Sequence, residues 1–256
     1  MKPDDAPAPI VGLGQKFSSG EILGNHSHRR DQVLYPLRGV IEMQTPEGRW
    51  VLPPHRALWI PRNTEHSLFC RQESEVYAVY LSASELTLRL RKSDVLDVSP
   101  LLRELILEAC GLPWNYLEES YESQLMRFLY VTLSRAPREP MHLPFPVDRR
   151  ARTFAQYVIE NGLASCDVDS ICELAGLSRR TLSRVYKRET SMTVNQWLQL
   201  YRMHEAAALL VSGCSVQDIF YQLGYNSPSS FSVAFRTFFG KSPREYRDIG
   251  KRKRAS

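Results

Sequence analysis

The chain has 256 residues, of which 43% are hydrophobic and 24% charged, and its formal net charge is +5. A chain of this length suits two domains that each bury a core of their own. No stretch of about 18 apolar residues occurs and no apolar run follows the N-terminal MKPDD, so the sequence predicts neither a membrane span nor a signal peptide. Functions that need a membrane-spanning segment are therefore excluded at this stage.

The positive charge is concentrated in the second half of the chain. Residues 148–256 contain 17 Lys and Arg against 10 Asp and Glu, whereas residues 1–147 contain 16 against 18. Such an imbalance is typical of a domain that binds a polyanion, although a charged solvent-facing surface would give the same count. Charge alone leaves both interpretations open.

The five cysteines are scattered and form no CxxC pair. An odd and dispersed set argues against a disulfide framework and predicts a reducing, cytoplasmic environment. Cys166 and Cys172 are close enough in sequence to form a redox pair, but buried small hydrophobic side chains are the simpler interpretation.

Residues 1–83 are predicted to form an arm followed by a small β domain. Residues 1–14 are rich in Pro, Asp and Ala and predict a loose arm. Beyond Gln15, short apolar runs alternate with turn residues, which is typical of a small antiparallel barrel or sandwich. We expect strands at 33–39, 40–45, 49–52, 57–61, 67–70 and 76–81.

Residues 84–135 change to a helical period. The segments 100–110 and 117–134 predict two amphipathic helices, and one face of the second is marked by Leu125, Phe128, Leu129 and Thr132. Exposed apolar faces usually mark interfaces, so we expect this region to form a homodimer contact. Packing against the barrel of the same chain is the alternative.

Residues 136–147 contain four prolines and predict a semi-rigid linker between two domains. The basic domain is expected at 148–250. The terminal KRKRAS at 251–256 is predicted to be a disordered basic tail, which either attracts a polyanion nonspecifically or is inert.

The stretch 215–247 predicts a helix, a tight turn and a second helix. Ile219 and Leu223 lie on one face of the first helix, and Gly224-Tyr225-Asn226 interrupts it. Ser227 is a natural N-cap with proline at the first helical position. A buried stripe then recurs at helical spacing: Phe231, Ala234, Phe235 and Phe238. This pattern is typical of a helix-turn-helix, the arrangement that enters a DNA major groove.

The same pattern occurs a second time, about 48 residues upstream. Ile171 and Gly176 match Ile219 and Gly224, and past the turn the offset becomes 49, as a duplicated motif tolerates. The predicted helix 194–212 joins the two copies and spans roughly 28 Å at about 1.5 Å per residue. This length approaches one DNA turn of about 34 Å, so both second helices are expected to reach successive major grooves.

Residues 148–248 resemble the DNA-binding domain of the AraC/XylS family of bacterial transcription regulators. The resemblance is carried by LSRRTLSRVYKRET at 177–190, HEAAALL at 204–210 and GYNSPSSFSVAFRTFFGKSPREYR at 224–247. It implies seven helices with two helix-turn-helix units, at about 167–189 and 215–239. It also implies binding of double-stranded promoter DNA and, in most members, recruitment of RNA polymerase as an activator.

The residues predicted to face DNA lie at matching positions on the two second helices. They are Arg180, Ser183, Arg184 and Lys187 in the first unit, and Ser229, Ser232, Val233 and Arg236 in the second. Guanidinium groups can donate twice to guanine, so we expect Arg180 and Arg184, with Ser183 beside them, to read bases. Lys187, Arg236 and Arg179 are expected to bind the phosphate backbone, and Val233 to touch a thymine methyl. A solvated helix face is the alternative for any one of them.

A second constellation lies in the β domain. His26 and His28 are followed by Gln32 and Gly39, and PRNTEH occupies 61–66. This arrangement is similar to the two sequence motifs of the cupin fold, which implies a small barrel and, at the matching positions, a divalent transition metal held by His26, His28, Gln32 and His66. Gln32 replaces the carboxylate of the cupin pattern, and Asn63 stands where glycine is usual. The alternative is that the histidines line an organic-ligand pocket or hydrogen-bond the barrel.

Tyr35, Arg38 and Trp59 are further candidates for an effector pocket, in which Arg38 would pair with an anion. For Tyr35 and Trp59, core packing is the simpler interpretation. The predicted fold class is α+β multidomain, with a cupin-like β-barrel plus helices followed by an all-α tandem helix-turn-helix domain.

The leading functional hypothesis is a non-enzymatic regulator that responds to a small-molecule or metal effector. Two alternatives remain at this stage. The first is a metal-dependent cupin enzyme, a dioxygenase or isomerase, fused to a DNA-binding domain. The second is a constitutive regulator whose barrel binds nothing.

Overall fold

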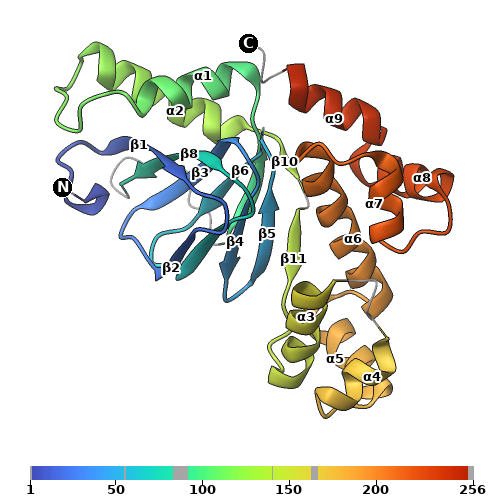
Figure 1. Ribbon diagram of the computed structural model, residues 1–256. Helices are drawn as coiled ribbons and strands as arrows, with labels where there is room; N and C mark the ends of the chain where they lie inside the picture. The colour runs from blue at the N-terminus through green and yellow to red at the C-terminus, as the bar shows by residue number, and fades with distance from the viewer. Residues whose placement is uncertain (1, 55, 83–91, 140, 163–166, 253–256) are drawn as a thin grey trace. The chain divides into compact units, whose positions relative to one another are not determined.

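The computed structural model describes residues 2–54, 56–82, 92–139, 141–162 and 167–252. The chain divides into two compact units. The first comprises residues 1–46 and 50–142, and the second comprises residues 47–49 and 143–256. Antiparallel sheets and helices occur in the N-terminal part and helices alone follow beyond residue 149 (Figure 1), which confirms the predicted α+β class.

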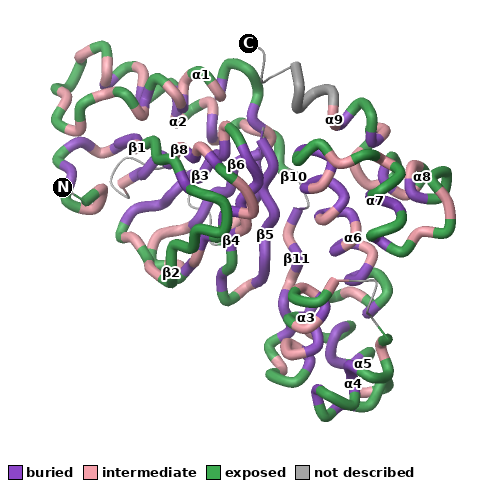
Figure 2. Tube along the Cα trace, viewed as in Figure 1, coloured by how far each residue is buried: buried purple, intermediate pink, exposed green. Residues whose placement is uncertain are grey.

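Two sheets build the N-terminal part of the chain. The first has the strand order β1-β8-β3-β6-β9-β10 and the second has the order β11-β5-β4-β7-β2. Burial differs along the second sheet, because β5 is buried along its whole length whereas β2 is largely exposed (Figure 2). The strands are β1 (Ile10–Phe17), β2 (Ile22–His26), β3 (Asp31–Arg38), β4 (Ile41–Thr45), β5 (Gly48–Leu52), β6 (Arg56–Ile60), β7 (His66–Cys70), β8 (Ser74–Leu81), β9 (Asp94–Asp97), β10 (Arg138–Glu139) and β11 (His142–Pro144).

The N-terminal arm is shorter than predicted. Only the residues before Ile10 precede the first strand, and they contain one 3-10 turn at Pro3–Asp5. Strand β1 pairs with β8 over eight residues, from Ile10 opposite Leu81 to Phe17 opposite Ser74. The two glycines of β1 lower its intrinsic strand preference, and one of them has a packing role. A Cβ on Gly12 would lie 2.7 Å from the carbonyl oxygen of Ala109, so glycine is needed where the strand passes a helix.

Strand β9 lies in the region that was predicted to be helical, so that prediction is wrong for residues 94–97. Val95 and Leu96 are buried, and β9 pairs antiparallel with β6, placing Val95 opposite Leu58. Without this partner the backbone groups along that side of β6 would lack hydrogen bonds. Residues 83–91, where the helical period was expected to begin, lie outside the described residues.

Two helices, α1 (Pro100–Ala109) and α2 (Tyr121–Arg135), pack together on the first sheet. Ser120 caps α2, so the predicted start at residue 117 is four residues early. The face of α2 that packs on the sheet is formed by Ser123, Met126, Leu129 and Leu133. Phe128, one of the residues that mark the predicted apolar face, is 50% exposed, because the buried stripe is rotated from that face.

The proline-rich segment 136–147 is structured, in contrast to the predicted linker. It contributes the short strands β10 and β11 to the two sheets. Leu143 and Phe145 are buried in the core of the second unit. The carbonyl of Pro144 accepts a hydrogen bond from the indole nitrogen of Trp197 at 2.7 Å. Proline is tolerated here because these strands are short and lie at sheet edges.

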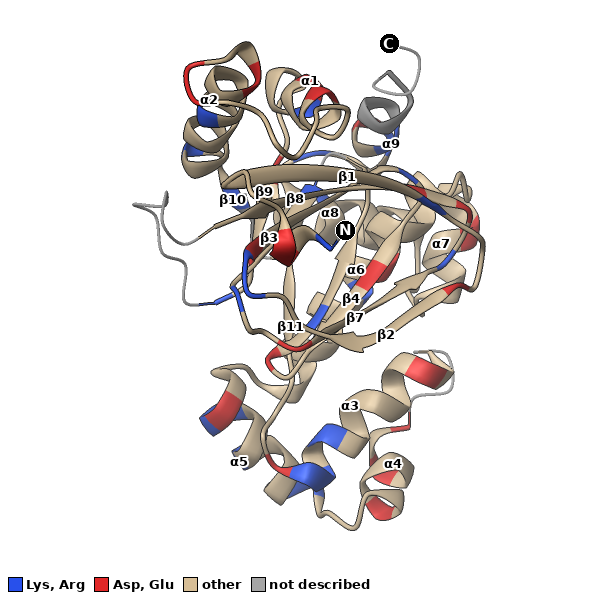
Figure 3. Ribbon diagram, turned by 90° about the vertical axis from the view of Figure 1, so that its left-hand side faces the viewer, with Lys and Arg blue, Asp and Glu red and all other residues tan. Residues whose placement is uncertain are grey.

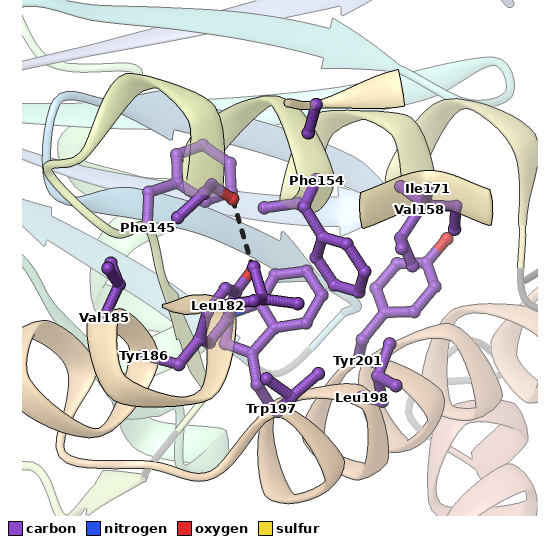
Figure 4. Packing of buried hydrophobic residues seen from close by; sticks show 14 of the residues in the cluster. Phe145, Phe154, Val158, Ile171, Leu182, Val185, Tyr186, Trp197, Leu198 and Tyr201 are labelled. Atoms are coloured by element: carbon purple, nitrogen blue, oxygen red, sulfur yellow. Dashed lines mark hydrogen bonds between the residues drawn. The ribbon is translucent and has the colours of Figure 1, made fainter. Parts of the chain in front are cut away.

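The second unit is helical. Side chains of its helices α3 to α6 form a hydrophobic core around Phe154, Tyr186 and Trp197 (Figure 4). In this core the Tyr186 hydroxyl donates to the carbonyl of Ala151 at 3.5 Å. Seven helices are described in this unit, as the family resemblance implies. They are α3 (Arg149–Asn161), α4 (Val168–Leu174), α5 (Arg179–Thr190), α6 (Val194–Val211), α7 (Val216–Gln222), α8 (Pro228–Phe239) and α9 (Pro243–Arg252).

The two helix-turn-helix copies repeat in local detail. Ser178 and Ser227 cap α5 and α8, each accepting the backbone N–H three residues later. Gly176 and Gly224 adopt φ of 67° and 70° after the preceding helix, a conformation that favours glycine. Helix α9 extends to Arg252, so the first two residues of the predicted disordered tail are helical, and residues 253–256 lie outside the described residues.

A fragment of residues 143–256 is expected to fold alone, and a fragment of residues 148–256 to be less stable. The shorter fragment lacks Leu143 and Phe145, and burying each such side chain contributes about 1.5–3 kcal/mol. It also lacks the carbonyl acceptor of Trp197. Thermal melting followed by far-ultraviolet circular dichroism would measure the difference in melting temperature. Equal melting temperatures would show that the segment 143–147 contributes nothing to this core.

Candidate nucleic-acid interface and histidine cluster

Helix α5 presents its buried and exposed residues on opposite faces. Leu182, Val185 and Tyr186 are buried in the core of the unit. The predicted DNA-facing stripe of this helix is exposed at every position. It consists of Arg180, Ser183, Arg184 and Lys187. Lys and Arg lie along α3 and α5, whereas α4 carries Asp and Glu only (Figure 3).

The arginines of α5 differ in their partners. Arg179 forms an ion pair with Asp169 of α4, with 3.0 Å between guanidinium and carboxylate. Within the described part of the chain, no carboxylate pairs with Arg180 or Arg184. The Nζ of Lys187 donates to the carbonyl of Ser191 at 3.3 Å, just after the C-terminal end of the helix. Arg180 and Arg184 therefore have their guanidinium groups available to an external ligand.

Helix α8 presents fewer charges. Phe231 and Phe235 are fully buried, while Ala234 and Phe238, the other predicted members of that stripe, are half-buried. The predicted DNA-facing positions are exposed apart from Ser232, which is half-buried. They are Ser229, Ser232, Val233 and Arg236. Val233 is 67% exposed.

Three histidines converge in the N-terminal unit. His26 ends β2 directly opposite His66, the first residue of β7, and His28 follows in the next loop. The ring centroids lie 4.3 Å apart for His26 and His66, 5.0 Å for His26 and His28, and 5.4 Å for His28 and His66. One ring nitrogen from each lies within 4.8 Å of the others. The predicted histidine set is therefore brought together by the structure.

Backbone carbonyls fix two of these rings. The Nδ1 of His26 donates to the carbonyl of Gly24 at 2.7 Å, and the Nδ1 of His66 donates to that of Thr64 at 2.8 Å. With the proton on Nδ1, the lone pair of each ring is left on Nε2, the orientation found in histidines that bind metals. The buried Nε2 atoms of His28 and His66 have no hydrogen-bond partner among the described residues.

The local electrostatics favour neutral imidazoles at His28 and His66. The pKa of His66 is lowered to about 4, mainly by burial and also by the neighbouring His26 and His28, against the hydrogen bond to the Thr64 carbonyl, which raises it. Burial, followed by the neighbouring His26, also lowers the pKa of His28. A neutral ring is the form that donates a lone pair to a metal.

Gln32, the fourth predicted ligand, lies behind the histidines on β3. Its amide nitrogen donates to the Tyr80 hydroxyl at 3.1 Å, and the Tyr80 ring stands edge-on to His28 with centroids 5.1 Å apart. The amide oxygen of Gln32 is buried without a partner among the described residues. An orphaned amide oxygen and orphaned imidazole nitrogens fit the donor set of a divalent transition metal.

Asn63 explains one departure from the cupin pattern. Its φ is 60°, in the left-handed region, where asparagine is the best tolerated residue after glycine. In that conformation its backbone N–H donates to the carbonyl of His28 at 2.7 Å. Asparagine therefore replaces glycine without loss of the turn, and the turn holds the loop that carries His28.

The three predicted effector-pocket residues are not brought together. Tyr35 and Trp59 are buried in the cluster that joins the first sheet to α1 and α2, so the core interpretation describes their surroundings. Arg38 is exposed at the end of β3. Tyr80, which contacts both Gln32 and His28, was missed by the sequence analysis. The alternation of side chains along strand 76–81 would have placed Tyr80 on the same face as Ala78, but it would not have shown that Tyr80 lies next to His28.

Comparison with known proteins finds a family match within the helical unit. Residues 171–249 match the family model described as "Helix-turn-helix domain". The chain is thus a DNA-binding regulator with a helix-turn-helix domain. This part of the chain is similar to the DNA-binding domains of AraC/XylS-type transcription regulators. Among the described residues, no helix combines the length and apolarity that crossing a membrane requires.

Two relatives that match most of this chain are named as regulators. HTH-type transcriptional regulator NimR of Escherichia coli K12 is 28% identical over 221 residues, which cover 86% of this chain and 81% of NimR. The xylose operon regulatory protein of the same strain is 23% identical over 219 residues, and the match spans 53% of that protein. Among solved structures, ToxT from Vibrio cholerae O395 aligns with a TM-score of 0.41 at 14% identity, covering 94% of this chain and 98% of ToxT. The alternative of a cupin enzyme has no support among these relatives.

Proposed function

We propose that this chain is an effector-responsive regulator that binds promoter DNA through α5 and α8 in successive major grooves. The observation that carries the proposal is the matched pair of exposed stripes on two helices with identical caps. Helix α6, which joins the two helix-turn-helix motifs, has 18 residues and spans about 27 Å at 1.5 Å per residue. That separation suits two grooves on one face of DNA, whose turns repeat about every 34 Å.

The stripes divide into base-reading and backbone-binding residues. Arg180 and Arg184 read bases, because their guanidinium groups are exposed and can donate twice to a guanine edge. Ser183 lies beside them. Lys187 and Arg236 bind phosphates, and Arg179 reaches a phosphate only if it leaves Asp169. Surface pairs of this kind contribute about 0–1 kcal/mol, so the exchange costs little.

Helix α8 contributes shape and apolar contact more than hydrogen bonds. Val233 meets a thymine methyl, and the hydroxyls of Ser229 and Ser232 bond to backbone or bases. Its single cation on this stripe limits its share of the affinity. We infer that α8 mainly fixes the position of the domain on the duplex.

The effector is a divalent transition metal held by His26, His28 and His66, with the amide oxygen of Gln32 as a further donor. The proposal is supported over a purely structural role by three converging imidazoles, two of them oriented by backbone carbonyls and two with buried Nε2 atoms that have no partner among the described residues. When bound, the ion supplies a positive charge and a fixed geometry that draws β2, β7 and the His28 loop together. It can shift the regulator only by binding one conformation of the protein better than another.

The remaining partners are a second copy of the chain and RNA polymerase. A homodimer through α1 and α2 is supported by three large apolar side chains on these helices, Leu101, Phe128 and Val131, which are 53%, 50% and 43% exposed. Recruitment of RNA polymerase follows from the family alone.

The double variant His28→Ala/His66→Ala is expected to lose stoichiometric metal. Two of three imidazole ligands would be missing, and even the loss of a residue that only orients a ligand typically weakens metal affinity about 10–100-fold. Purified protein dialysed against Zn²⁺, Ni²⁺ or Co²⁺ would be measured by elemental analysis, and its affinity for promoter DNA would be titrated with and without the ion. His142→Ala, a histidine of the same unit outside the cluster, is the matched control. One metal per chain in the double variant would exclude this site, and equal DNA affinity with and without metal in the wild type would exclude the metal as effector.

A further inference from the structure

A cavity of about 410 Å³ lies in the first unit. Its walls come from five places in the sequence. They are the N-terminal segment 7–10, Arg30 at the entry to β3, Ser82 after β8, the connection 115–118, and the face of α2 that carries Ser123, Met126, Arg127 and Tyr130. These α2 positions follow the i, i+3, i+4, i+7 spacing of one helix face. A cavity of this volume is within the range that holds small organic ligands.

Arg30 is a buried cation in the wall of this cavity. It is only 8% exposed, and its guanidinium donates to the carbonyls of Ala6, Ala8 and Pro9 at 2.6 to 3.1 Å. These acceptors are neutral. No carboxylate of the described residues forms an ion pair with Arg30, since nearby Asp4 and Asp5 pair with Arg29 instead. The wall therefore holds a buried positive charge that carbonyl dipoles solvate but do not neutralise.

A second cation stands at the cavity on α2. Arg127 is exposed, and within the described part of the chain it has no ion-pair partner. One carboxylate, Glu118, also lines the cavity, in the connection before α2. Two guanidinium groups against one carboxylate leave the cavity net positive. Apart from the amide of Asn115, the rest of the lining is apolar or hydroxylic and includes Ile10 and Met126.

We propose that this cavity binds a small organic anion with an apolar body, such as an aryl or alkyl carboxylate or sulfonate. The acidic head would lie at the two guanidiniums, which match planar oxyanions in geometry and are only weakly hydrated. The apolar body would contact Ile10, Met126 and the prolines of the N-terminal segment. A metal cation is disfavoured by the same positive charge, so the site is separate in chemistry from the histidine cluster. The proposal does not depend on the metal site.

Binding is tested with two fluorescent probes that share one skeleton. 8-Anilinonaphthalene-1-sulfonate is the anion, and N-phenyl-1-naphthylamine is the same aromatic body without the sulfonate. The full-length wild type is expected to bind the anion about tenfold more tightly, the value of one charge-assisted hydrogen bond. Arg127→Gln should remove that preference and leave the affinity for the neutral probe unchanged. Arg135→Gln, an exposed arginine on the same helix outside the cavity, is the matched control and should change anion affinity by less than about twofold.

A second substitution tests the buried wall. Arg30→Gln should also weaken binding of the anionic probe about tenfold, provided that the circular dichroism and melting temperature of the variant match those of the wild type. If Arg30→Gln unfolds, the Arg127→Gln and Arg135→Gln pair decides alone. Equal affinity of the wild type for both probes, or equal loss in Arg127→Gln and Arg135→Gln, would overturn the proposal, because the probe would then bind a nonspecific apolar surface.

Discussion

Replacing Arg184 by alanine is expected to weaken binding to the cognate promoter site by about 1–3 kcal/mol and to relax discrimination at one base pair. Arg184 is exposed on α5, and no carboxylate of the described residues occupies its guanidinium. A bidentate contact to a guanine edge would be lost, and another base at that position would then be penalised less. Arg180→Ala should behave in the same way at a different base pair.

Lys187→Ala should weaken cognate and random DNA equally. A lysine on a phosphate releases one condensed cation, so its loss should reduce the slope of log K against log salt by about one unit. The hydrogen bond from Lys187 to Ser191 is at 3.3 Å, weak enough to exchange for a phosphate. The contrast between the two variants separates base reading from backbone binding.

Titrations of cognate and scrambled duplexes at several salt concentrations provide the measurement. Arg188→Ala is the matched control, because Arg188 lies on α5 outside the stripe and pairs with Glu189. If Arg184→Ala weakened both duplexes equally and flattened the salt slope, Arg184 would be a phosphate anchor. Specificity would then have to come from Arg180, Ser183 or α8.

The helical unit was predictable because its signals are local. Ser227 and Pro228 specify the start of α8 by capping chemistry, and Gly224 specifies the turn by its left-handed backbone. The burial of Phe231 and Phe235 follows from helical period alone. Duplication then tested each assignment a second time within the same sequence. Contacts between distant residues were hardly needed to identify these elements.

The N-terminal unit was less predictable because its pairing is long-range. Val95 and Leu96 form a strand only because β6 offers them a free edge, which no window around residue 95 reveals. Tyr35 and Trp59 alternate correctly along their strands, but the period does not say which face α1 and α2 cover. The histidines were found because their spacing is similar to the two cupin motifs, although β2 ends at His26 and His28 lies in the loop that follows. Tyr80 was missed because nothing local links it to His28.

Gly39→Ala is expected to be the most damaging of the glycine substitutions in the β domain, costing about 2–5 kcal/mol of unfolding free energy. Gly39 is the glycine of the first cupin-like motif and lies between β3 and β4 with a φ of 82°. A Cβ there would lie 2.2 Å from the Ser74 hydroxyl and 2.7 Å from the carbonyl oxygen of Glu73. The hydroxyl can rotate away only by leaving the carbonyl of Gln72, to which it donates at 2.8 Å, and the Glu73 backbone is fixed at the β8 end.

Gly20→Ala separates the two causes of that loss. Gly20 has nearly the same φ, 80°, but nothing lies within 4 Å of its Cβ position. Its substitution should therefore cost only the left-handed backbone penalty of about 1–2 kcal/mol. Urea unfolding followed by tryptophan emission reports mainly on this part of the chain, since Trp50, Trp59 and Trp114 lie there and only Trp197 lies in the helical unit. A larger loss for Gly39→Ala than for Gly20→Ala assigns the excess to the contacts with residues 73 and 74. Equal losses would mean that β4 or the turn before β8 shifts to admit the methyl group, and that the motif glycine is required for its backbone conformation alone.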